Sequence, residues 1–125
     1  MKILAIDYGE KQIGLAVSNA RETIALPFGI LENDDELLNN LEDIISKEEI
    51  EKIVIGIPSY NQKTKIYKDI QTFTARLANT FSIPVMPQDE LLTTEAARRV
   101  TDKKQKNRHD LAAFHILESY LFGAC

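Results

Sequence analysis

Apolar runs and short polar breaks in the first thirty residues predict three consecutive strands. We expect these strands over about 2–8, 12–18 and 23–31, where hydrophobic residues cluster between turn-forming segments. Short connections favour antiparallel pairing, because a parallel pair needs a long crossover between its strands. The beginning of the chain is therefore predicted to form a three-stranded antiparallel meander.

Beyond this meander the apolar residues change to a spacing of three and four, which is typical of one helical face. Asp34 and Asp35 are expected to begin the first helix, as an N-cap and a first-turn acid. A second helical stripe covers 66–81. Further helices are expected over about 93–101, and over about 109–122 near the end of the chain.

Two more strands are expected between these helices. The continuous apolar run over 53–57 is typical of a central parallel strand, whereas two prolines within 83–87 favour an edge position. With right-handed crossovers, the order of elements predicts an α/β fold. We expect a five-stranded mixed sheet, antiparallel in its first three strands, with helices on both faces, in a single domain over 1–125.

The charge of the chain is unevenly distributed. The net charge of −4 argues mildly against a nucleic-acid-binding protein, yet nine acids and one base lie between Glu32 and Glu51. The remainder of the chain is net basic. A solvated loop would explain the most basic segment, but phosphate contacts are the alternative function. That segment carries one acid and six bases, namely Arg98, Arg99, Lys103, Lys104, Lys106 and Arg108.

Composition also suggests a compartment. No apolar run approaches the length of a membrane span, and the N-terminus lacks the pattern of a secretory signal peptide. Cys125 is the single cysteine, so no disulfide can form within the chain. A cytoplasmic location is the expectation that follows.

Acidic residues stand where the predicted sheet would place a site. Asp7 ends the first strand, Asp89 and Glu90 follow the last strand, and Asp110 opens the last helix. Each has a plain structural alternative as a turn, surface or helix-dipole acid. Sites in α/β sheets gather at the carboxyl ends of strands, and converging carboxylates repel one another unless cations lie between them. Oxygen ligands suit Mg²⁺ or Mn²⁺, and we expect two such ions.

Four motifs along the chain carry a resemblance to a known family. The match that they define extends over nearly the whole chain, at the length typical of that family. The chain resembles the YqgF/RuvX family, bacterial nucleases with an RNase H-like fold that are related to Holliday junction resolvases. In order, the motifs are Asp7-Tyr8-Gly9-x-Lys11-x-x-Gly14-Leu15-Ala16, Val54-Ile55-Gly56-Ile57-Pro58, Asp89-Glu90-x-Leu92-Thr93-Thr94-x-x-Ala97 and Asp110-Leu111-Ala112-Ala113-x-x-Ile116-Leu117-x-x-Tyr120-Leu121.

The resemblance implies a cytoplasmic, metal-dependent nuclease that matures the 5′ end of the 16S rRNA precursor. Asp7, Glu90 and Asp110 would be its catalytic, metal-binding acids. Asp89 stays open as an alternative to Glu90, because adjacent side chains on an extended segment point apart. We expect structured RNA as the partner, held by Lys11, Lys63 and Lys65 together with the basic residues of 98–108.

This chain departs from the family pattern in several places, including the loop over 59–63, which lacks the glycine that is usual there. Gln12 and Leu91 stand where the family commonly has arginine, and Asn19 stands where it commonly has aspartate. The missing arginines would weaken phosphate contacts. Two alternatives therefore stay open: a nuclease acting on branched DNA, like the Holliday junction resolvases, and a non-catalytic RNA-binding factor of ribosome assembly. Either a monomer or a homodimer fits the sequence.

Overall fold

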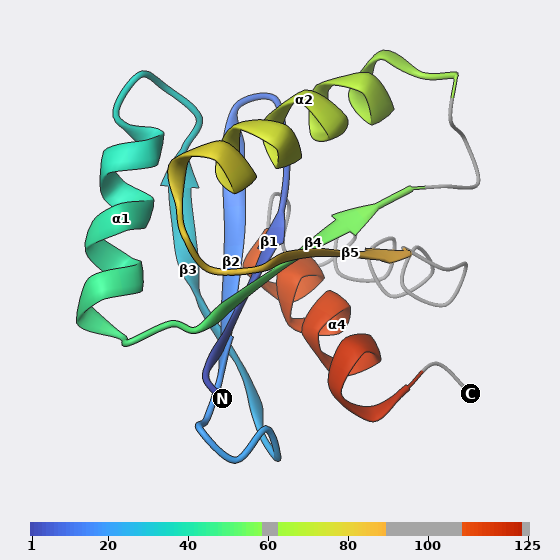
Figure 1. The fold of residues 1–125 in the computed structure, drawn as a ribbon. Helices are drawn as coiled ribbons and strands as arrows, with labels where there is room; N and C mark the ends of the chain where they lie inside the picture. The colour runs from blue at the N-terminus through green and yellow to red at the C-terminus, as the bar shows by residue number, and fades with distance from the viewer. Residues whose placement is uncertain (59–62, 90–108, 124–125) are drawn as a thin grey trace.

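The computed structural model describes residues 1–58, 63–89 and 109–123, and shows a mixed sheet with helices on both faces (Figure 1). The strand order across the five-stranded sheet is β3-β2-β1-β4-β5. This is the predicted fold class. In chain order the elements are β1 Ile3–Asp7, β2 Gln12–Ser18, β3 Ala25–Glu32, α1 Leu37–Lys47, β4 Lys52–Ile57, α2 Lys65–Thr80, β5 Val85–Asp89 and α4 His109–Phe122.

The central strand β1 joins an antiparallel half of the sheet to a parallel half. It pairs antiparallel with β2, which pairs antiparallel with β3, so the predicted meander is confirmed. On its other side β1 pairs parallel with β4, and β4 pairs parallel with β5. The carboxyl ends of β1, β4 and β5 therefore lie at one edge of the sheet, where ligands of α/β proteins commonly bind.

The final strand is an edge strand, as predicted, but it lies further along the chain than 83–87. Its pairing with β4 begins at Ile53↔Val85 and continues to Ile57↔Asp89. Pairing with β4 therefore extends β5 beyond 87, so that Gln88 and Asp89 at its end belong to the sheet.

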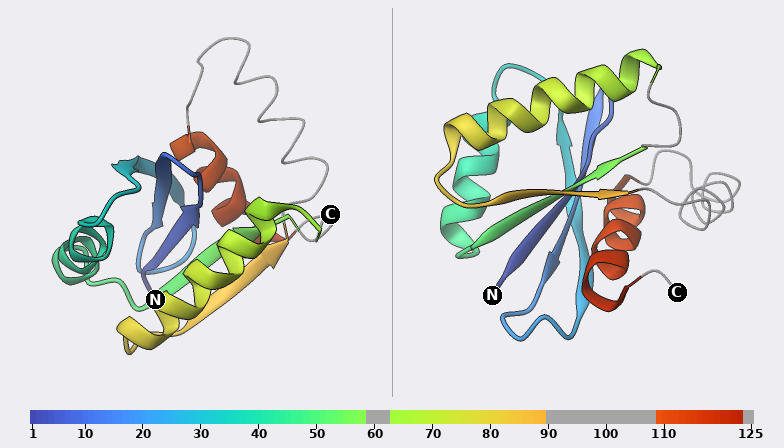
Figure 2. Two further views of the ribbon diagram at one scale, coloured as in Figure 1. Left: turned by 90° about the horizontal axis from the view of Figure 1, so that it is seen from above. Right: turned by 45° about the vertical axis from the view of Figure 1, so that its right-hand side comes forward.

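Helices α1 and α2 lie on one face of the sheet and α4 lies on the other (Figure 2). Strand residues alternate between these faces. Leu4 and Ile6 of β1 pack in the cluster that includes α1 and α2, while Ile3 and Ala5 pack against α4. We call these sides the α1/α2 face and the α4 face.

The predicted start of the first helix is wrong. Helix α1 begins at Leu37, with Glu36 at the N-cap position. The Asp34 carboxylate accepts a hydrogen bond from the Glu36 amide at 3.0 Å, and the Asp34 carbonyl accepts one from the Leu37 amide at 3.1 Å. Asp34 therefore forms a turn of its own before the helix, as short polar side chains often do.

Two predictions for the later helices have different outcomes. The predicted helix over 109–122 is confirmed as α4, and Gly123 follows it with a positive φ of 80°. The predicted helix over 93–101 lies outside the described residues. None of the described helices is long and apolar enough to cross a membrane.

Candidate functional site

Asp7 lies at the carboxyl end of the central strand, on the α4 face of the sheet. It follows Ile3 and Ala5 in the alternation of β1, and both of those residues pack against α4. Only 4% of Asp7 is exposed. Burying a carboxylate is costly unless hydrogen bonds or opposite charges compensate it. Because such a position is retained at a cost, Asp7 is the strongest candidate for a functional residue among those that the structure describes.

Both neighbouring strands carry a glycine beside Asp7. Gly14 of β2 is the register partner of Asp7. On β4, Gly56 directly follows Ile55, which is the partner of Ile6, so it lies at the level of Asp7 by the same register. Glycines within strands mark places where another group approaches the backbone closely. Neither neighbouring strand therefore places a side chain directly beside Asp7 on this face.

Helix α4 runs so that its first turn points toward the same edge. Near the far end of the helix, the Tyr120 hydroxyl accepts a hydrogen bond of 2.7 Å from Nζ of Lys52. Lys52 is the first residue of β4 and therefore lies at the amino end of the parallel strands. Since the end of α4 is held there, its beginning lies toward Asp7. Asp110 is the second residue of α4, which brings its backbone to the edge expected from the sequence.

The structure separates Asp89 from Asp7. Asp89 pairs with Ile57 in the parallel ladder, and Ile57 packs on the α1/α2 face. Paired residues of neighbouring strands share a face, so Asp89 lies on the α1/α2 face and Asp7 on the opposite one. Asp89 is therefore a poor candidate for a ligand shared with Asp7. Glu90, the other acid of this pair in the sequence, lies outside the described residues.

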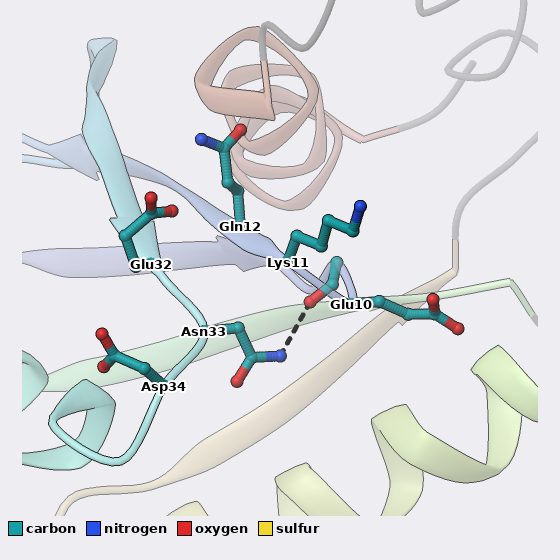
Figure 3. A pocket seen from close by; sticks show the side chains of 7 residues that line it. Glu10, Lys11, Gln12, Glu32, Asn33 and Asp34 are labelled. Carbon is teal, nitrogen blue, oxygen red and sulfur yellow. Dashed lines mark hydrogen bonds between the residues drawn. The ribbon is translucent and has the colours of Figure 1, made fainter.

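The loop between β1 and β2 is held in place by Asn33. The Asn33 side chain donates a hydrogen bond to the Gly9 carbonyl at 2.8 Å, and its backbone amide donates to the Lys11 carbonyl at 2.9 Å. A hollow of about 760 Å³ lies beside this loop (Figure 3). It contains more carboxylates than cations: its lining residues are Gly9, Glu10, Lys11, Gln12, Glu32, Asn33 and Asp34.

Among the expected nucleic-acid contacts, Lys65 has its charge already balanced. Its Nζ lies 2.8 Å from the Asp69 carboxylate and 3.9 Å from that of Glu10. The hydrogen bond and charge of Asp69 raise the pKa of Lys65 above its ordinary value, and Glu10 adds to this effect. Lys11 and Lys63 are exposed. These two are thus better placed than Lys65 to attract an additional phosphate.

Asn19, one of the departures from the family pattern, has a structural role at the opposite end of the sheet. Its side-chain oxygen accepts hydrogen bonds from the amides of Thr23 at 2.9 Å and Ile24 at 3.0 Å. These bonds hold the turn between β2 and β3, and they explain why β3 starts at Ala25 rather than near residue 23. An aspartate could accept the same two bonds, so this departure changes the turn little, and it lies at the end of the sheet away from Asp7.

Several expected site residues are not described. Glu90 and the basic residues Arg98, Arg99, Lys103, Lys104, Lys106 and Arg108 lie outside the described residues, as does Leu91. In the part of the chain that the structure describes, no three His, Cys, Asp or Glu side chains gather closely enough to hold a metal ion. The three-carboxylate site thus stays a prediction, for which the structure supplies the position of Asp7 and the direction of α4.

Sequence reasoning missed a second hollow next to the site. It measures about 130 Å³, and Tyr8, Asn33 and Arg76 line it together with Asp69, Thr72 and Phe73 of α2. The one available signal was the aromatic residue directly after Asp7, since alternation turns it to the opposite face. Residues 8, 33 and 76 are too far apart in the sequence for periodicity to connect them.

Known proteins resemble this chain over almost its full length. The family model RuvX, described as Holliday junction resolvase, matches residues 1–122. A protein of Rickettsia canadensis (strain McKiel) named "Putative pre-16S rRNA nuclease" is 35% identical over 134 residues, which cover 96% of this chain and 85% of the relative. A protein of the same name from Maridesulfovibrio salexigens is 33% identical over 135 residues, covering 99% of this chain and all of the relative.

A solved structure supports the fold independently of sequence. RuvC of T. thermophilus, in complex with Holliday junction substrate, superposes with a TM-score of 0.61 at 14% identity, covering 99% of this chain and 98% of that chain. At this identity the likeness shows the fold alone, which is RNase H-like. With the family model matching nearly every residue, the conclusion is plain: the chain belongs to the RuvX family.

Proposed function

We propose that this protein is a divalent-metal-dependent nuclease that hydrolyses phosphodiester bonds in structured RNA, and that its substrate is the 5′ end of the 16S rRNA precursor. The observation that carries the proposal is Asp7, a buried acid at the carboxyl end of the central strand with glycines on both neighbouring strands. Family membership and the names of the relatives support the reaction class. Such an rRNA substrate would place the protein in the cytoplasm.

In this proposal the metal ligands are Asp7, Glu90 and Asp110. Carboxylate oxygens are the donors that Mg²⁺ and Mn²⁺ prefer, and the glycines beside Asp7 bring no side chain that would compete for the ion. Two such ions, when bound, would activate a water molecule and stabilise the departing oxygen of the phosphodiester. Glu90 rather than Asp89 is assigned this role, because Asp89 lies on the α1/α2 face.

The chain's own residues would position the RNA. Asp7 is held in place by a strand that is paired on both sides, so its carboxylate needs little reorganisation to bind. Lys11 is exposed in the loop that follows, where it can contact a backbone phosphate. Lys63 and the basic segment 98–108 would extend these contacts along the strand.

The test is cleavage of a 5′-extended 16S rRNA precursor by the purified protein with Mg²⁺ or Mn²⁺. Asp7→Asn keeps the size of the side chain but removes the charge, and we expect cleavage to fall by at least about 100-fold, since even residues that only orient metal ligands cost 10- to 100-fold. Glu90→Gln should behave similarly. Asp89→Asn is the matched control and should cleave like the wild type. Equal cleavage by the Asp7→Asn and wild-type proteins would refute the mechanism.

Two outcomes would redirect the proposal. The family description and the RuvC structure point to branched DNA as the alternative substrate, so a four-way DNA junction belongs in the same assay. Preferential cleavage of the junction would favour a resolvase-like nuclease. RNA binding without cleavage, and without Mg²⁺ or Mn²⁺ binding by calorimetry, would instead favour an assembly factor; Gln12 and Leu91, in place of arginines, motivate that reading.

A further inference from the structure

The small hollow beside Tyr8 combines an aromatic wall with polar groups at its rim. Tyr8 is half-buried, and its ring packs on that of Phe73 with centroids 5.0 Å apart and planes inclined by 46°. Phe73 is only 3% exposed, so the Tyr8 ring packs on a residue of the core. The ring of Tyr8 is therefore held in one place before any ligand arrives.

Helix α2 supplies the facing wall. Asp69, Thr72 and Arg76 line the hollow, and their spacing of three and four places them on one side of the helix. Asp69 is already hydrogen-bonded to Lys65 at 2.8 Å. Arg76 is exposed and makes no ion pair within the described part of the chain. The rim thus offers a donor with an uncompensated charge at one end and an acceptor at the other.

The hollow adjoins the candidate site without belonging to it. Tyr8 directly follows Asp7, yet it packs on the α1/α2 face while Asp7 lies on the α4 face. Asn33 lines this hollow and also the larger one beside the β1–β2 loop. A nucleic acid strand that placed a phosphate at Asp7 would therefore pass the edge of the sheet close to Tyr8.

We propose that this hollow binds an unstacked nucleobase of the substrate, next to the phosphate that is cleaved; the proposal rests on the nuclease function proposed above. A base has flat faces for the Tyr8 ring and an edge with both donors and acceptors, which Arg76, Asn33 and Asp69 can match. A phosphate fits less well, because it could use Arg76 but would leave the face of the Tyr8 ring without a contact partner. Stacking on an aromatic ring is the usual means of holding single-stranded nucleic acid.

The test measures base stacking without cleavage. Short single-stranded RNAs carry the fluorescent base 2-aminopurine, moved one position at a time, and are bound in EDTA. Stacking quenches this base, so we expect one position to be quenched on binding to the wild type. Tyr8→Ala should abolish that quenching and weaken binding by about fivefold to a hundredfold. Removing the base at that position from the RNA should cost the wild type a similar factor and Tyr8→Ala little.

Control variants separate the hollow from folding and from charge. Tyr8→Phe keeps the ring and should keep the quenching. Arg76→Gln should weaken binding more than Lys68→Gln, which removes an exposed cation of α2 that does not line the hollow. Thermal melting shows whether Tyr8→Ala remains folded. If Tyr8→Ala does not fold, the RNA affinities of Arg76→Gln and Lys68→Gln test the hollow instead, and equal losses of affinity would overturn the nucleobase site.

The outcomes are distinguishable from those of the nuclease test. Quenching that is unchanged in Tyr8→Ala, or RNA without the base binding as tightly as intact RNA, would overturn the nucleobase site, whatever cleavage shows. A free mononucleotide that binds as tightly as RNA would overturn it too, and would assign the hollow to small nucleotides. If quenching depends on Tyr8 but Asp7→Asn cleaves normally, the nucleobase site stands and the proposed cleavage mechanism fails.

Discussion

The two faces of the sheet are built from different residues, and the central strand shows the difference most clearly. Its α1/α2 face carries Leu4 and Ile6, whereas its α4 face carries Ala5 and Asp7 near the functional edge. Large branched side chains bury much apolar area and contribute most of the hydrophobic stability. Small residues contribute less, but they let a helix approach the strands closely. The α1/α2 face thus contributes most to the stability of the fold, and the α4 face carries the candidate site.

The α4 face is itself graded along its length. Near the amino end of β1, Ile3 packs in the same cluster as Ile116 and Leu117. Toward Asp7 the contributing residues become Ala5, Ala16 and Ala113, together with Gly14 opposite Asp7. On β1 and β2, the α4 face therefore presents small residues next to the candidate site.

The largest expected effect comes from truncating the α1/α2 face. Leu41 of α1 is fully buried, so Leu41→Ala should lower the free energy of unfolding by about 2–5 kcal/mol. Cleavage per folded molecule should be nearly unchanged, because the cavity that this substitution leaves lies on the α1/α2 face, away from Asp7. Urea denaturation and the rRNA cleavage assay measure the two quantities, with Asn40→Ala as an exposed neighbouring control. Equal losses in both quantities would show that the faces do not have separate roles.

Placing a larger side chain on the α4 face should lower the free energy of unfolding less than Leu41→Ala does, and should reduce cleavage more. Ala113 is fully buried, so Ala113→Leu should cost about 1–3 kcal/mol of folding free energy and push α4 away from the sheet. Because α4 carries Asp110, cleavage should fall even where the variant is fully folded. Ala75→Leu, at an exposed position of α2, is the matched control. Normal cleavage by folded Ala113→Leu would separate helix position from activity.

The smallest effect is expected from restoring a family arginine at the edge of the α4 face. Gln12 lies two residues before Gly14 on β2, which puts it on the same face as Asp7. Gln12→Arg should tighten RNA binding by roughly twofold to tenfold, with little change in stability. One added phosphate contact should also steepen the salt dependence of binding, by about 0.7 in log–log slope. Asn40→Arg, the same charge change on α1, should give neither effect.

The extent to which the site was predictable differs from residue to residue. Asp7 and the first turn of α4 follow from local patterns, because an apolar run that ends in an acid and a helical stripe are short-range features. The face of the sheet on which Asp89 lies did not follow from such patterns. It depends on the register of β5 against β4, which places Asp89 beside Ile57. No pattern within either strand specifies that register.

The sequence by itself determined the type of each described element, the meander, the alternation that gives each strand two different faces, and an acid at the end of the central strand. Strand and helix periods express these features locally. Only the tertiary structure decided the strand order β3-β2-β1-β4-β5, the side taken by α4, and the meeting of Tyr8, Asn33 and Arg76 around one hollow. These depend on packing between segments far apart in the chain, where many arrangements satisfy the same local pattern and only the assembled core distinguishes among them.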